Sequence, residues 1–93
     1  MFTTREEAKQ SCIVEAQAVE RFSKATEKAM ANGNQSWAYD MADIAKTALD
    51  CARLAHEALW SLTKGNLTEE EFEAFAKAEE VELTFKKAMA SLN

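Results

Sequence analysis

Apolar residues recur with a helical period along three long segments of the chain. With side chains placed at about 100° per residue, the segment 37–64 separates into an apolar half and a charged half. The apolar half consists of Trp37, Ala38, Met41, Ile44, Ala45, Ala48, Leu49, Ala52, Ala55, Leu59 and Leu62. A face this wide can pack against two neighbouring helices, and its many alanines allow another helix to approach closely.

The segments 5–31 and 69–91 show the same period with a different balance of apolar and polar positions. The stripe of segment 5–31 consists of Ala8, Cys12, Val14, Ala18, Val19, Phe22, Ala25 and Ala29. Segment 69–91 has only a narrow polar face, and its apolar residues are Phe72, Phe75, Ala78, Val81, Leu83, Phe85, Met89 and, just beyond it, Leu92. Because two alanine-rich helices offer limited cover, we expect part of this last segment to meet a second copy or a partner protein.

Residues that break helices lie only between these segments. The chain has no proline and two glycines, Gly33 and Gly65, and within a helix a glycine costs roughly 1 kcal/mol and a proline roughly 3 kcal/mol relative to alanine. Short connections favour antiparallel neighbours. We therefore predict a single domain over residues 1–93, an all-α antiparallel three-helix bundle with helices at about 5–31, 37–64 and 69–91.

Capping residues support the three predicted helix starts. Ser36 is the expected N-cap of the second helix, and Thr68 with Glu71 has the spacing of a capping box before the third. Two overlapping boxes compete at the first helix, Thr3 with Glu6 and Thr4 with Glu7.

The charge balance bears on the class of partner. The formal net charge is -5, and residues 66–93 carry seven acidic residues against three lysines. Nucleic-acid affinity depends largely on basic side chains, so we expect no nucleic-acid binding and favour a protein partner. The sequence shows no apolar run long enough to cross a membrane, no secretory signal and too few cysteines for a disulfide framework. We therefore expect a cytoplasmic protein without membrane association.

Four ionisable residues interrupt the apolar faces: Glu15, His56, Glu79 and Glu82. Folding the antiparallel helices on their loops brings these residues, together with Arg53, to nearby levels of the bundle. One interpretation is a polar belt, in which Arg53, Lys86 and His56 pair with the glutamates. A second is a metal site of the kind that carboxylates and histidines form inside helical bundles, and a third is a pocket for a small ligand. Because Arg53 stands where a Glu-x-x-His pattern needs glutamate, the belt is the favoured interpretation.

Cysteine and tryptophan each allow two roles. Cys12 and Cys51 are predicted to face each other across the first hairpin, near His56, which is a set that zinc accepts. The commoner role of a free cysteine is that of a small buried side chain. Trp37 and Trp60 lie near the two ends of the second helix, either as core residues or as interface hot spots.

No set of residues in the sequence matches a known catalytic mechanism or cofactor motif. We therefore expect a non-enzymatic interaction, adaptor or regulatory module without a cofactor, which acts through an apolar helical face and forms a homodimer through the last helix. The candidate interface residues are Trp60, Phe72, Phe75, Val81, Phe85 and Met89. The alternative function is a metal-binding helical bundle that uses Glu15, His56, Glu79 and Glu82.

Overall fold

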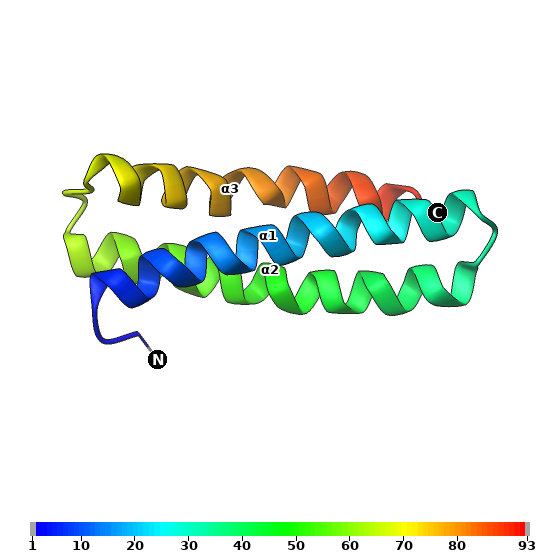
Figure 1. Cartoon of the computed structure of the whole chain (residues 1–93), viewed down its shortest axis with the longest axis horizontal. Coiled ribbons are helices and arrows are strands. Elements are labelled where there is room, and N and C mark those ends of the chain that lie inside the picture. Colours follow the sequence, from blue (N-terminus) through cyan, green and yellow to red (C-terminus); the bar gives the residue numbers. More distant parts are fainter. Residues whose placement is uncertain (1, 93) are drawn as a thin grey trace.

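The computed structural model describes residues 2–92 and contains three helices, α1 (Arg5–Ala31), α2 (Gln35–Thr63) and α3 (Glu69–Ala90). The helices run antiparallel along an elongated bundle of 45 × 22 × 16 Å (Figure 1). Each helix packs against the other two, and the described residues include no strand. This confirms the predicted all-α antiparallel three-helix bundle.

Two reciprocal capping boxes set the starts of α1 and α3. Thr4 is the N-cap of α1: the backbone amide of Glu7 donates to Thr4 Oγ1 at 3.1 Å, and the Thr4 amide donates to Glu7 Oε1 at 3.1 Å. Thr68 and Glu71 repeat this arrangement at α3, at 3.2 and 2.8 Å. Of the two boxes that competed at the first helix, the structure contains the one built on Thr4.

The start of α2 differs from the prediction. The helix begins at Gln35 rather than Trp37, because the N-cap is Asn34 and not Ser36. Asn34 Oδ1 accepts a hydrogen bond of 3.1 Å from the Trp37 amide. Both side chains are good caps, and asparagine also suits the turn that follows Gly33.

The end of α2 depends on two residues in the left-handed conformation. Lys64 is the C-cap with a φ of 54°, and Gly65 follows with a φ of 79°. The sequence predicts a helix that includes Lys64, whereas the structure ends α2 at Thr63 and places Lys64 just beyond it. A Cβ atom at Gly65 would lie 3.2 Å from the Trp60 ring, so both the backbone angle and the close ring favour glycine.

The core consists mostly of alanine, which brings the helices close together. One buried cluster contains Ala8, Cys12, Ala52, Ala55, Leu59, Ala74 and Ala78. A second contains Ala16, Val19, Ala48, Leu49 and Val81. Because alanine fills little volume, the larger apolar residues of α2 and α3 are left at the edges of the core, and many stay exposed.

Candidate interaction surfaces

The four residues of the predicted metal site do not come together. His56 and Glu79 are neighbours, with 3.6 Å between Nε2 and Oε2, whereas Glu82 pairs with Arg53. Glu15 lies in a groove between α1 and α2, on another flank of the bundle. No group of three or more histidine, cysteine, aspartate or glutamate side chains within residues 2–92 converges on a point that could hold a metal ion. The prediction that these four residues form one site is therefore wrong.

The polar belt is present between α2 and α3. Arg53 Nε donates to Glu82 Oε1 at 2.9 Å, and Lys86 Nζ lies 3.8 Å from the other oxygen of the same carboxylate. The hydrogen bond and positive charge of Arg53 lower the pKa of Glu82. These ion pairs are partly exposed, so each contributes little to the stability of the fold.

The two cysteines lie in different surroundings, which excludes the zinc set that the sequence allowed. Cys12 is fully buried in the core, and burial raises the pKa of its thiol to about 11. Cys51 is half-buried in the groove between α1 and α2. Both thiols are free. Cys12 is thus the small buried side chain of the commoner interpretation, whereas Cys51 is part of a surface.

An aromatic patch lies where α2 meets α3, and we define it as His56, Trp60, Phe72 and Phe75. The rings of His56 and Phe75 stack, with centroids 3.7 Å apart and planes 20° apart. Trp60 lies 5.5 Å from Phe75 and is 52% exposed. Phe72, one turn before Phe75, is 59% exposed. His56, Trp60 and Phe75 line an open groove with Glu57 and Ser61.

The histidine of this patch has an unsatisfied polar atom. His56 Nε2 is buried and has no hydrogen-bond partner among residues 2–92. Its closest carboxylate oxygen, on Glu79, lies 3.6 Å away, which is too far for a hydrogen bond. A buried polar atom without a partner costs free energy that a docking group can recover.

The predicted interface residues fall into three classes. Trp60 and Phe72 are exposed, whereas Phe75, Phe85 and Met89 are half-buried. Val81 is only 3% exposed and lies in the core beside Val19 and Leu49. Val81 therefore belongs to the interior of one subunit, because α3 turns this side of its broad apolar surface toward α1 and α2. Its prediction as an interface residue is wrong.

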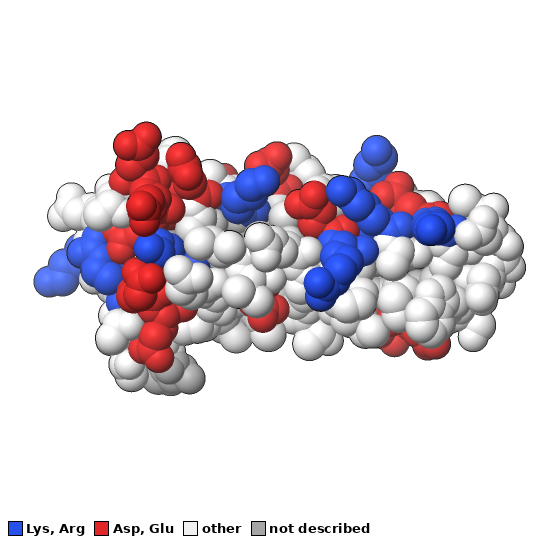
Figure 2. Space-filling model, viewed as in Figure 1, with Lys and Arg blue, Asp and Glu red and all other residues white. Residues whose placement is uncertain are grey.

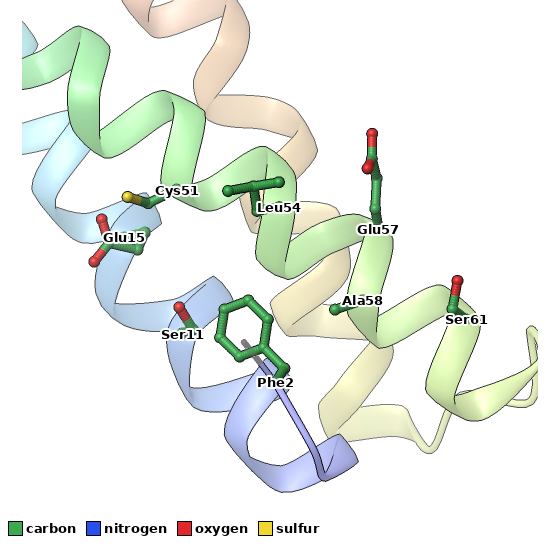
Figure 3. Close-up of a pocket in the computed structure, with 8 residues that line it drawn as sticks. All are labelled: Phe2, Ser11, Glu15, Cys51, Leu54, Glu57, Ala58 and Ser61. Atoms are coloured by element: carbon green, nitrogen blue, oxygen red, sulfur yellow. The ribbon is translucent and has the colours of Figure 1, made fainter.

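A second apolar groove lies between α1 and α2, and the sequence pattern did not lead us to predict it. Its lining includes Phe2, Leu54 and Ala58, together with Glu15 and Cys51 (Figure 3). Leu54 is 61% exposed. The available signal was the spacing of Ile44, Cys51 and Ala58, one heptad apart beside the buried face.

Charged side chains are distributed unevenly over the face that Figure 2 shows. In Figure 2 they concentrate over α1 and α3, whereas the lower part of the view, over α2, is mostly uncharged. This agrees with α2 carrying most of the exposed large apolar residues: Trp37, Tyr39, Ile44, Leu54, Trp60 and Leu62. None of the described helices is both long and apolar enough to cross a membrane.

Comparisons with family models, with curated proteins and with solved structures found no match for this chain. The function is therefore argued from these surfaces.

Proposed function

We propose that this protein is a non-enzymatic interaction module that binds a partner protein through the aromatic patch. The single observation that carries the proposal is the exposed Trp60 ring beside the stacked pair of His56 and Phe75. Tryptophan and other aromatic residues supply most of the binding energy at many protein interfaces. The open groove beside these rings offers a place for an apolar side chain of the partner.

The surroundings of the patch support a protein partner that carries a hydrogen-bonding or basic group. Glu57 lines the groove, and Glu79 lies at its edge beside the unsatisfied His56 Nε2. Docking a protein here covers exposed apolar surface, which favours the complex.

Trp60 and Trp37 provide a matched test of this proposal. Both lie on α2 and both are 52% exposed, but only Trp60 belongs to the aromatic patch. In affinity capture with the immobilised protein, we expect Trp60→Ala to lose the bound partner and Trp37→Ala to retain it. Truncating a hot-spot aromatic residue costs about 2 kcal/mol or more, which weakens binding roughly thirtyfold. Equal capture by the two variants would exclude the patch as the binding surface.

We also propose that a second copy binds through α3, which would make the protein a homodimer. Phe72 and Leu83, at 59% and 71% exposed, are the large apolar residues that α3 leaves most open. Light scattering is expected to give a mass that rises with concentration, and Leu83→Glu, which lies outside the aromatic patch, is expected to return it to one subunit with helicity retained. A mass of one subunit at every concentration would contradict the homodimer while leaving the aromatic patch free for another protein.

A further inference from the structure

The groove between α1 and α2 lies on the other flank of α2 from the aromatic patch. Glu57 and Ser61 line both grooves, so this part of α2 forms the ridge between them. On α1 the groove is lined by Ser11 and Glu15. Cys51 and Leu54 line this groove alone, and Trp60 and Phe75 line the other alone, so each surface can be changed without the other.

Small residues form the floor of this groove, and larger ones stand at its sides. Ser11 on α1, and Cys51 and Ala58 on α2, are half-buried, and the two α2 residues lie one heptad apart. Leu54, exposed by 61%, stands beside them. A floor of small residues between two antiparallel helices is the shape into which another helix packs closely.

The chain itself shows which side chain the groove accepts. Phe2 precedes α1, and its ring points into the space between α1 and α2 (Figure 3). The ring packs against the core cluster that contains Cys12 and Leu59. A large apolar side chain from outside the three helices thus already occupies one end of the groove.

Carboxylates surround this apolar floor without a matching cation. Glu15 and Glu57 line the groove, which has no lysine or arginine in its lining. Within residues 2–92, neither side chain forms an ion pair. The charge of the groove therefore complements a basic occupant.

We propose that this groove binds an amphipathic helix of a partner protein, whose apolar side chains enter between α1 and α2 and whose basic side chains face Glu15 and Glu57. The helix would lie as a fourth member of the bundle and extend the contacts that Phe2 begins. The proposal can be tested separately from the aromatic patch, because Glu15, Cys51 and Leu54 line only this groove.

A second copy of this chain is a poorer occupant. A two-fold dimer places the same surface of each subunit against the other. The groove would then oppose Glu15 and Glu57 with the same carboxylates of the second copy, which is repulsive.

Cys51 reports directly on whether the groove is occupied. Its thiol lies in the groove and is half-buried, whereas Cys12 is fully buried with a raised pKa. Iodoacetamide is therefore expected to modify Cys51 first in the folded protein. A helix bound in the groove would slow this reaction.

The test uses a synthetic amphipathic helix of leucine and lysine, and a matched helix of leucine and glutamate. We expect the lysine peptide to slow Cys51 alkylation about tenfold or more at saturation, as for a covered thiol, and the glutamate peptide to leave it unchanged. Leu54→Ala and the double variant Glu15→Gln, Glu57→Gln are each expected to weaken binding of the labelled lysine peptide roughly tenfold. Glu73→Gln with Glu80→Gln on α3, and Trp60→Ala in the aromatic patch, serve as controls and should leave binding unchanged.

Three outcomes would overturn the proposal. One is alkylation of Cys51 at the same rate with and without the lysine peptide. Another is that the α3 and groove variants weaken binding of the lysine peptide equally, which would indicate that the peptide is attracted only by the net charge of the protein. The third is a dimer in light scattering that Leu54→Ala dissociates, which would identify the occupant as a second copy. None of these depends on the Trp60 comparison, so failure here and failure of the proposed function are distinguishable.

Discussion

Arg5 joins the first turn of α1 to the first turn of α3. Its guanidinium donates two hydrogen bonds of 2.6 Å to the carboxylate of Glu71 and one of 2.9 Å to the carbonyl of Asn66. Glu71 also accepts from the Thr68 amide within its capping box. These contacts hold the pKa of Glu71 at about 2, with the Arg5 hydrogen bond as the main cause. One carboxylate thus caps a helix and ties two helices together.

Glu71→Gln is expected to lower the free energy of unfolding at neutral pH. The variant is also expected to lose less of this free energy than the original protein as the pH is lowered. The folded pKa of about 2 lies below the ordinary 4.5, so the contribution of Glu71 is complete above about pH 4.5 and is lost as the pH falls toward 2. Glutamine still serves in a capping box, so the variant removes mainly the charge. Urea unfolding at a series of pH values measures the effect.

Glu70→Gln is the control for this prediction. Glu70 is 82% exposed and lies 3.3 Å from Lys9, so its loss should change stability by less than about 1 kcal/mol. If Glu71→Gln and the original protein lost stability in acid to the same extent, the assigned role of the Arg5–Glu71 pair would be wrong.

At the scale of the element, α2 contributes both to the core and to two surface grooves. Its buried face packs in the core through Ala52, Ala55 and Leu59. Residues on either side of that face line the two grooves. Leu54 and Leu59 lie on the same helix and differ fully in burial, at 61% and 0% exposed. The same residue type therefore serves the core at one position and a surface at the other.

Leu59→Ala is expected to destabilise the protein by about 2–5 kcal/mol, because it leaves a cavity in the core. Leu54→Ala is expected to change stability by about 0.5 kcal/mol or less, as for an ordinary surface substitution. Thermal or urea unfolding followed by circular dichroism compares the two variants. Similar losses for both would mean that α2 is rotated about its axis from the orientation described.

At the scale of the whole molecule, alanine decides how closely the helices approach. Ala8, Ala52 and Ala74 come from three different helices and belong to one buried cluster. Replacing such an alanine by a larger residue forces helices apart, and the cost falls on the packing of the entire bundle.

Ala52→Leu is therefore expected to destabilise the fold by about 1–3 kcal/mol through overpacking. Ala90→Leu is the control, because Ala90 is exposed at the end of α3 and a larger side chain meets no core there. Unfolding curves of both variants measure the difference. A neutral Ala52→Leu would show that the helices separate at little cost.

Much of the architecture follows from the sequence because it depends on local interactions. The bounds of α1, the Thr68 capping box and the turn at Gly65 each involve residues a few positions apart. The start of α2 was misplaced because Asn34 and Ser36 are both good caps and only the backbone of the turn chooses between them.

The candidate site was less predictable, because it depends on how each helix is rotated against the others. Trp60 was identified because tryptophan is common at interfaces, and Phe72 and Phe75 because the last helix has more apolar surface than two alanine-rich helices can cover. Val81 proved to be core, and Leu54 was missed. Glu15 was predicted near His56 only because the two residues lie at a similar height along the bundle axis. In the structure they lie on different flanks of the bundle.

The amino-acid sequence by itself determined that this chain forms three antiparallel helices and where they begin and end to within a few residues, because helical period, caps and breakers act over short distances. The tertiary structure decided which apolar residues enter the core and which form the aromatic patch and the α1–α2 groove. That choice depends on side-chain volumes across three helices at once, and alanine at their contacts leaves the larger apolar residues outside.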